Sequence, residues 1–425
     1  MDRIIEGFVE KFTIADPVHL LELDAQLQVG GEQLSGKATV SLNWNDGPSV
    51  ELHWAAEEGN LLFDRFPDNL VLNGTNYAQS WGTTGLNSWE SGFSSFDWNW
   101  SDQECVEVVS HVCLFPQTKG ESILAGNRQY CGRYHVQFSE WRLDFDCKPI
   151  DRNAGDRPAW DQDKITHLVR LRRVDGLAFQ TSAAEDILHA FHWFLSFCRA
   201  GFTQATLFSS SNENGVMWKA LSGDVRPLGH PFGWFKGVSE RHKGKEADQS
   251  FESTFKLFLD KWLAAEDELK LLVSWYCTAS ASGRVEQRIL SLIAGLEQLY
   301  FPDERKGITT LGQKIDRFNH DHGVVIPLTH LEITSAAQGG ARNRIVKISE
   351  LLPNVRNKIA HGKRAQHINL QCDRHGLLVE TWLLALKTFE LSVLAFIGHR
   401  GLYTDPTVLS KSDVSLVPWA NAPCD

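Results

Sequence analysis

The sequence predicts an α+β protein, in which a β-rich N-terminal domain is followed by an all-α helical bundle. Eleven of the fifteen tryptophans lie in the first 240 residues, and stretches that alternate apolar and polar residues cluster there. Apolar residues at helical spacing dominate the second half. A polar, charged segment at 236–250 separates the two patterns and is typical of a linker. We therefore expect a β-rich domain over residues 1–240, a helical domain over 250–400 and a tail over 401–425.

The N-terminal half contains one clear hairpin signal. Residues Lys37–Trp44 alternate apolar and polar side chains, the Asn-Asp-Gly-Pro segment 45–48 is typical of a turn, and Val50–Trp54 alternates again. In the run 169–172 apolar residues alternate with arginines, so one face of that strand is expected to be exposed to solvent. Further strands are expected at Val106–Phe115, Tyr134–Phe145, Ile165–Val174, Ala205–Ser209 and Gly215–Leu221.

Two other segments of this half carry side chains of interest. Residues 75–101 mix Asn, Gly, Ser and Thr with six Trp and Phe rings, and we expect a loop whose rings either pack on the sheet or form a recognition surface. Residues 183–199 have apolar positions at helical spacing and predict an embedded helix. Its His189 and His192 are three residues apart, but no third ligand lies nearby, so core or surface histidines are the better interpretation.

The C-terminal half is expected to be a set of helices. The predicted helices cover Phe251–Cys277, Gly283–Tyr300, Thr310–Phe318, Arg342–Leu352 and Leu377–Ile397. In the second of these, Glu297 borders the apolar stripe, and a carboxylate beside an apolar face usually has a partner. Pro353 is expected to end the fourth helix and to start a new turn.

That turn brings together residue types that suit RNA cleavage, namely Arg356, Asn357 and His361. Histidine exchanges protons near neutral pH, and a guanidinium group stabilises the charge that grows on an attacked phosphate. An arginine followed by a histidine also occurs at 317–322, again with four residues between them, and at 128–135 with six, but only Arg356 has a polar follower and an apolar helical segment upstream. The role of His361 as base, acid or phosphate ligand stays open.

The charge distribution also favours a phosphate site near this motif. The net charge of the chain is −11, yet residues 341–364 contain seven basic residues and one acid, a local charge of +6 that leaves −17 for the remainder. A local basic stripe on an acidic protein can bind phosphates. Beside Arg356, the residues expected to bind RNA are Arg342, Arg344, Lys347, Lys358, Lys363 and Arg364.

Two spaced patterns in the helical half carry a family resemblance. The first, E-x-R-(I/F)-L-x-L-x-x-x-L-E-x-L, is matched by Glu286, Arg288, Ile289, Leu290, Leu292, Leu296, Glu297 and Leu299, and the second, R-N-x-x-x-H, by Arg356, Asn357 and His361. Over roughly residues 250–400 the chain thus resembles the HEPN domain of ApeA-like abortive-infection proteins. The resemblance implies a metal-independent endoribonuclease without a cofactor, which acts as a toxin-like effector in antiphage defence. Arg356, Asn357 and His361 would be catalytic, with Glu297 in support.

The resemblance also implies partners. RNA would be the substrate, with tRNA among the candidates, and the helical domain would join two copies in a homodimer or an assembly of dimers. The β-rich half would serve as a sensor or inhibitor that responds to a phage-derived trigger. Two other interpretations remain, a non-catalytic HEPN module that binds RNA or protein, and a glycan- or ligand-binding β domain whose helical half only dimerises.

The composition bears on the compartment. The eight cysteines are scattered, and none forms a CxxC pair, which favours a reducing environment. The first residues contain no apolar leader segment, and no run reaches the ~18 apolar residues of a membrane span. We therefore expect a cytoplasmic protein that does not contact a membrane.

Overall fold

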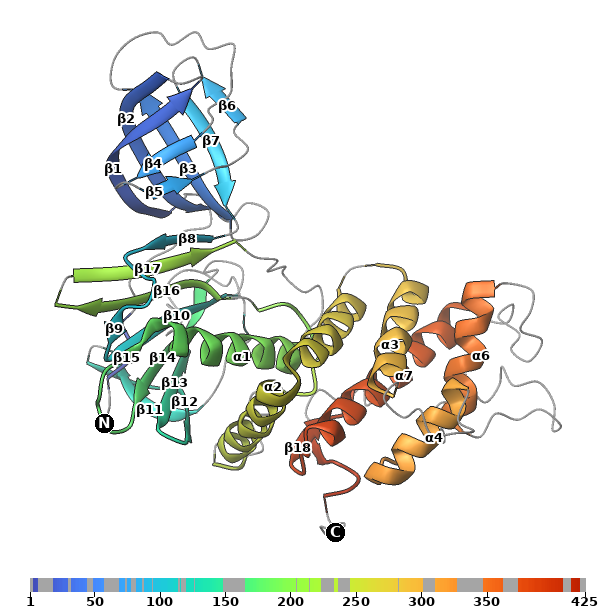
Figure 1. Ribbon diagram of the computed structural model, residues 1–425. Helices are drawn as coiled ribbons and strands as arrows, with labels where there is room; N and C mark the ends of the chain where they lie inside the picture. The colour runs from blue at the N-terminus through green and yellow to red at the C-terminus, as the bar shows by residue number, and fades with distance from the viewer. Residues whose placement is uncertain are drawn as a thin grey trace. The chain divides into compact units, whose positions relative to one another are not determined.

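The computed structural model divides the chain into two units, a β-rich one and a helical one (Figure 1). This confirms the predicted α+β class. The structure describes residues 3–6, 18–29, 32–43, 49–56, 69–72, 75–77, 82–85, 88–93, 95–113, 115, 120–125, 127–147, 165–203, 205–213, 215–222, 233–235, 245–281, 283–300, 310–326, 347–361, 374–407 and 414–420. Unit 1 comprises Met1–Gln117, Ser122–His189 and Thr203–Arg226, and unit 2 comprises Thr118–Glu121, Ala190–Phe202 and Pro227–Asp425.

The first sheet of unit 1 is antiparallel and has the strand order β5-β4-β1-β2-β3-β7-β6. Its strands are β1 (Val18–Val29), β2 (Glu32–Asn43), β3 (Ser49–Ala56), β4 (Asn69–Leu72), β5 (Thr75–Tyr77), β6 (Gly82–Gly85) and β7 (Ser88–Phe93). The predicted hairpin is β2–β3, where Ala38 lies opposite Trp54 and Val40 opposite Leu52. All four side chains are fully buried, because residues two apart on a strand share one face.

One glycine is required in this hairpin. A Cβ atom on Gly36 would lie 2.3 Å from the carbonyl oxygen of Ala55 and 2.4 Å from the ring of Trp54. Both distances are below any normal contact, so a side chain at this position would push β2 and β3 apart. Gly36 therefore allows the indole of Trp54 to lie against the backbone.

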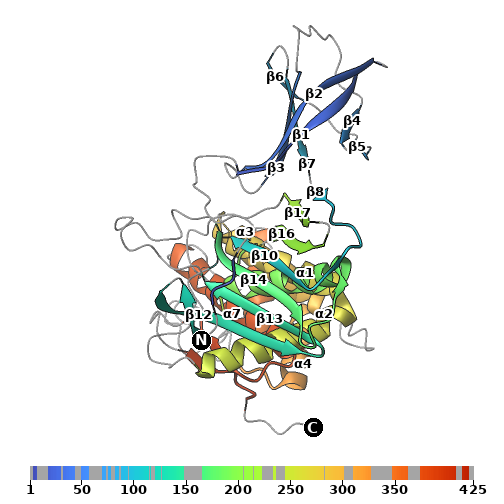
Figure 2. The same cartoon turned by 90° about the vertical axis from the view of Figure 1, so that its left-hand side faces the viewer.

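The second sheet of unit 1 has the order β11-β12-β13-β14-β10-β16-β17-β8, and Figure 2 shows β10, β13 and β14 side by side within it. Its strands are β8 (Ser95–Trp98), β10 (Glu107–Cys113), β11 (Glu121–Ala125), β12 (Arg128–Phe138), β13 (Trp141–Cys147), β14 (Ile165–Arg173), β16 (Ala205–Asn212) and β17 (Gly215–Leu221). The short strands β9 (Glu104–Cys105) and β15 (Phe179–Gln180) form a separate pair.

Two expectations for this unit are wrong. The run Tyr134–Phe145 is not one strand but most of the β12–β13 hairpin, because the chain reverses at Ser139, whose φ is 46°. The segment 75–101 is not a loop, since β5, β6, β7 and β8 lie within it. Its many Gly, Ser and Asn residues disfavour strands intrinsically, but ladder pairing with neighbouring strands overrides that preference.

A buried ion pair joins β12 to β13. The Nε atom of Arg133 donates to Oδ1 of Asp146 at 2.6 Å, and its Nη2 donates to Oδ2 at 2.7 Å. The side chains of the two residues are only 2% and 1% exposed. The backbone N–H of Ile5 also donates to Asp146, at 2.8 Å. This bidentate pair therefore ties the N-terminal segment to the second sheet.

The alternating arginines of β14 are not simply exposed to solvent, because they contact a buried carboxylate. Arg170 donates to the buried carboxylate of Asp144 at 2.8 Å, and Arg142 donates to it at 2.9 Å. Burial alone raises the pKa of Asp144, but the hydrogen bonds from Arg170 and Arg142 outweigh it and hold that pKa below its usual value. Arginines from β13 and from β14 thus stabilise the negative charge of Asp144.

His167 on β14 should make the protein acid-sensitive. It is fully buried, its ring stacks on Phe145 at 4.6 Å, and burial lowers its pKa from 6.5 to about 3. Between these two pKa values the imidazole of His167 is protonated in the unfolded chain but neutral in the folded protein. The free energy of unfolding therefore falls as the pH drops below 6.5. We expect this residue to remove about 2 kcal/mol between pH 7 and pH 5. Urea unfolding at both pH values checks this, and the pH-dependent loss should shrink by that amount in His167→Gln.

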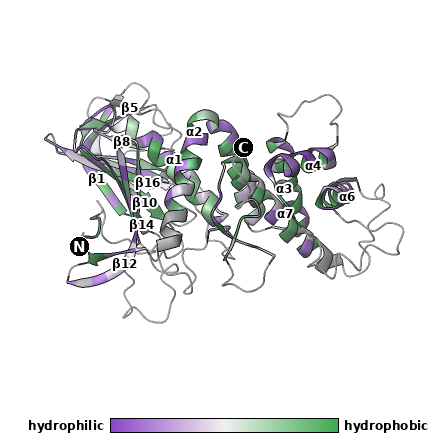
Figure 3. Ribbon diagram, turned by 90° about the horizontal axis from the view of Figure 1, so that it is seen from below, coloured by the Kyte–Doolittle hydropathy of each residue, from purple (hydrophilic) through white to green (hydrophobic). Residues whose placement is uncertain are grey.

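The helical unit is built from α2, α3, α4, α6 and α7 together with the end of α1 (Figure 1). The helices are α1 (Thr181–Arg199), α2 (Lys245–Ser280), α3 (Val285–Leu299), α4 (Leu311–His322), α6 (Ile348–His361) and α7 (Arg374–Phe396), and they are followed by a strand pair, β18 (Leu402–Thr404) and β19 (Val414–Leu416). Hydrophobic and hydrophilic stretches mix along α2, α3 and α4 in Figure 3, as expected for helices that bury one face. None of the described helices is long and apolar enough to cross a membrane.

Packing in this unit places α3 at the centre of the site described below. Helix α3 contacts α2 and α7 along its length, and α6 packs on α3, α4 and α7. The residues of the stripe predicted from the sequence are all buried, namely Ile289, Leu292, Ile293, Leu296 and Leu299. Helix α2 is kinked at Ala265, where φ is −155° and ψ is 55°. The part of α2 beyond the kink begins with the residues that face the cavity described below.

Candidate functional site

The Arg–Asn–His motif lies inside helix α6 and not in a turn after it. The expectation that Pro353 ends a helix is wrong, because α6 continues through this residue to His361. Proline has no N–H to donate to the carbonyl of Ser349, four residues earlier. At this point Gly312 of α4 comes so close that a Cβ atom on it would lie 2.5 Å from the Ser349 oxygen. Helix α6 thus packs closely against α4 at the turn that contains Pro353.

Arg356 is held against α3. Its Nη2 atom lies 3.4 Å from Oε1 of Glu297, and its Nη1 donates to Oδ1 of Asn357 at 3.4 Å. The side chains of Arg356 and Glu297 are 38% and 39% exposed. The sequence places these two residues in separate helices, and the structure supplies Glu297 with the cationic partner expected for a carboxylate beside an apolar stripe.

Asn357 and His361 are exposed near the C-terminal end of α6. They are four residues apart, so they lie on one face of the helix. Arg356 is displaced from Asn357 by one residue, or ~100° around the helix axis. The structure therefore orients Arg356 toward α3 and leaves the other two motif residues toward solvent.

The described residues include two of the six predicted RNA-binding cations. Lys347 is exposed immediately before α6, and Lys358 is half-buried within it. The other four, Arg342, Arg344, Lys363 and Arg364, lie outside the described residues. The described part of the basic stripe thus coincides with the helix that carries the motif.

The two other Arg–His spacings serve local contacts. On α4, Arg317 donates to Asp321 at 2.8 Å, and the ring of His322 lies 4.2 Å from that of Phe318. Burial lowers the pKa of His322. His322 was expected in a loop, but it closes the last turn of α4, which ends at Gly323 with φ 66°. The third spacing lies along strand β12.

The histidines of α1 also have ring contacts. The ring of His189 lies 5.6 Å from that of Phe208, and His192 is buried beside Phe191 at 6.4 Å. Within the described part of the chain, His, Cys, Asp and Glu side chains form no group of three that could hold a metal ion.

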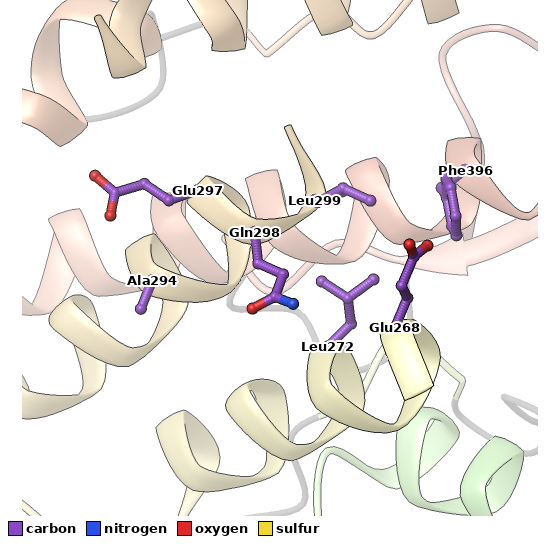
Figure 4. A pocket seen from close by; sticks show the side chains of 7 residues that line it. All are labelled: Glu268, Leu272, Ala294, Glu297, Gln298, Leu299 and Phe396. Atoms are coloured by element: carbon purple, nitrogen blue, oxygen red, sulfur yellow. The ribbon is translucent and has the colours of Figure 1, made fainter. Parts of the chain in front are cut away.

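A cavity of about 490 Å³ adjoins the ion pair (Figure 4). It lies between the second part of α2, the C-terminal half of α3 and the end of α7, and its lining residues are Glu268, Leu272, Ala294, Glu297, Gln298, Leu299 and Phe396. Of these, the sequence singled out Glu297 as a candidate site residue and Leu299 only as part of the apolar stripe, and it assigned no site role to the other five. Ala294 and Gln298 are four residues apart and share a helix face, but nothing in the sequence shows which helix lies opposite.

Two family models match the chain. A model described as the YopA central domain matches residues 101–225, and one described as the YopA C-terminal domain matches residues 263–414. The candidate site lies in the second match. A similar curated protein is the "SPbeta prophage-derived uncharacterized protein YopA" of Bacillus subtilis (strain 168), which is 25% identical over 337 residues, 72% of this chain and 70% of the relative. No solved structure matches the chain.

Proposed function

We propose that the helical unit is a metal-independent endoribonuclease of the HEPN type that acts in the cytoplasm as a toxin-like effector of abortive infection. The observation that carries this proposal is the pairing of Arg356 with Glu297 across α6 and α3. It orients a guanidinium group at a partly exposed surface, while His361 is exposed one and a half turns further along the same helix. Glu297 belongs to the first sequence pattern of the HEPN resemblance and Arg356 to the second, so the ion pair joins the two helices that carry the resemblance.

The chemistry needs a base, an acid and a cation. The ribose 2′-hydroxyl loses its proton and attacks the adjacent phosphorus, the bond from phosphorus to the 5′ oxygen breaks, and the leaving oxygen gains a proton. Imidazole groups exchange protons at neutral pH, and the Arg356 guanidinium would stabilise the additional negative charge on the phosphate. Asn357, which accepts a hydrogen bond from Arg356, would help to orient that guanidinium.

A second copy of the chain completes this arrangement. The side chain of Arg356 is directed toward α3. Asn357 and His361 are exposed and lie on a face of α6 that is turned by ~100° around the helix axis from Arg356. Two copies related by a two-fold axis would place the His361 of each copy near the Arg356 of the other. Such a homodimer would supply one imidazole as base and the other as acid, and it would double the local positive charge.

The β-rich unit is proposed to control this activity as a sensor of a phage-derived trigger. By its name, the similar protein from Bacillus subtilis is prophage-derived, so a related chain is encoded by a phage genome. Conflict between phages is a setting in which an RNA-cleaving toxin is useful. RNA, with tRNA among the candidates, is the proposed substrate.

Purified protein should cleave cellular RNA in the presence of EDTA. The products should carry 2′,3′-cyclic phosphate and 5′-hydroxyl ends, because the nucleophile is the substrate's own 2′-hydroxyl, and DNA of the same sequence should stay intact because it lacks that group. Gel analysis with end-specific labelling measures this. Equal cleavage of DNA, or activity that requires added Mg²⁺, would contradict the mechanism, and RNA binding without cleavage would identify a non-catalytic HEPN module.

A further inference from the structure

The cavity beside Arg356 combines apolar walls with two kinds of polar group. Leu272, Ala294 and Leu299 provide aliphatic surface, and the half-buried ring of Phe396 lines the cavity as well. Its volume of about 490 Å³ falls in the range of small-molecule sites, which are mostly apolar with a few polar groups that fix orientation. The cavity therefore has the composition of a site for a flat, partly polar ring.

The polar groups come from α2 and α3. Figure 4 shows the carboxylate of Glu268 beside the ring of Phe396, and the amide of Gln298 projecting from α3 toward the helix that carries Leu272. A carboxylate only accepts hydrogen bonds, whereas an amide both donates and accepts. A ligand that satisfies this pair must present at least one N–H or O–H donor.

Glu297 belongs both to the cavity lining and to the ion pair with Arg356. This residue lines the cavity, and its Oε1 lies 3.4 Å from Nη2 of Arg356. A phosphate bound to Arg356 would therefore lie at the edge of the cavity. Arg356 balances the charge of Glu297, and the Nζ of Lys261 lies over the Phe396 ring, 4.7 Å from its centre.

We propose that this cavity binds the nucleobase next to the cleaved phosphate and selects cytosine and adenine, which carry an amino group where uracil carries a carbonyl. The assignment rests on the proposed function in one respect, that the phosphate bound by Arg356 belongs to RNA. Single-stranded bases are recognised by stacking on aromatic rings and by hydrogen bonds to their edges, and Phe396 supplies such a ring.

The polar lining explains the selection. Carboxylates accept from the N4 amino group of cytosine, and Gln amides pair with the N6 and N7 atoms of adenine. Uracil presents its O4 carbonyl where cytosine carries the N4 amino group and adenine the N6 amino group, and that carbonyl facing Glu268 would bring two acceptors together. Only the N3–H of uracil could then donate to the carboxylate. The cavity should therefore accept cytosine and adenine and disfavour uracil.

Binding of 2′-O-methyl oligonucleotides tests the proposal without cleavage, because this ribose lacks the nucleophile. Fluorescence anisotropy in EDTA with hexamers of C, A and U should show C and A bound roughly tenfold more tightly than U, the effect of one good base-edge contact. Glu268→Gln should bring the C-to-U ratio close to one, because the new amide donates as well as accepts. Phe396→Leu should weaken all three hexamers by a similar factor.

Glu266→Gln is the matched control. This residue is exposed on the same helix, pairs with Lys270 at 2.5 Å and does not line the cavity, so the C-to-U ratio should stay at the wild-type value. A thermal unfolding midpoint equal to that of the wild-type protein would show that each variant is folded. Equal binding of the C and U hexamers by the wild-type protein, or an unchanged ratio in Glu268→Gln, would overturn the proposal.

The two proposals fail in different ways. Discrimination among hexamers in a protein that leaves ordinary RNA intact would support the base site and refute the ribonuclease. Metal-independent cleavage of RNA with no discrimination among hexamers would refute the base site and leave the ribonuclease standing.

Discussion

Replacing Arg356 or His361 by alanine is expected to lower RNA cleavage at least ~100-fold while the protein stays folded. Loss of a proton-transfer group or of a charged group that stabilises a transition state costs a factor of this size or more. Arg356 is 38% exposed and His361 is exposed, so the free energy of unfolding should change by no more than about 0.5 kcal/mol. Single-turnover cleavage in EDTA and urea unfolding of each variant measure the two quantities separately.

Arg317→Ala is the control for this experiment. Arg317 has the same spacing to a histidine, but its side chain pairs with Asp321 within α4, so cleavage should stay near the wild-type rate. If Arg317→Ala were inactive and Arg356→Ala active, the site would be assigned to the wrong helix.

Mixing the two inactive variants tests the composite site. If subunits exchange, the composite cleft of a hybrid dimer of Arg356→Ala and His361→Ala protein would keep one intact arginine and one intact histidine, and partial activity should return. A fully active monomer by light scattering at micromolar concentration would refute the dimer.

Replacing Asp146 by alanine is expected to destabilise the β-rich unit by about 3–5 kcal/mol, the cost of removing one partner from a buried ion pair. The guanidinium group of Arg133 would remain 2% exposed without its bidentate carboxylate. The backbone N–H of Ile5 would also lose its acceptor. Urea unfolding followed by tryptophan fluorescence reports on this unit, which contains most of the indoles.

Asp175→Ala is the matched control for that measurement. Asp175 pairs with Arg173 at 2.6 Å, but the two side chains are 42% and 25% exposed. A solvated pair of this kind contributes little to stability, because water screens both charges. A loss at Asp146 no larger than the loss at Asp175 would show that water reaches Arg133 in the folded protein.

Local patterns in the sequence were sufficient for elements that depend on one segment only. The alternation around the Asn-Asp-Gly-Pro turn predicted β2–β3, and the 3.6-residue period predicted α3 together with its buried stripe. Local patterns failed where neighbours decide the conformation. Strands β6 and β7 form in a Gly- and Ser-rich segment because of ladder pairing, and Pro353 stays inside α6, where Gly312 of α4 approaches the carbonyl of Ser349.

The candidate site divides in the same way. The sequence by itself determined the residue types and spacing of Arg356, Asn357 and His361, because a helical period relates them directly. It also indicated that Glu297 needs a partner. Only the tertiary structure decided that this partner is Arg356, and that Glu268 of α2 and Phe396 of α7 meet α3 around a cavity. These contacts join residues far apart in the chain, and the choice of facing helices depends on the packing of whole side-chain surfaces, which no single segment encodes.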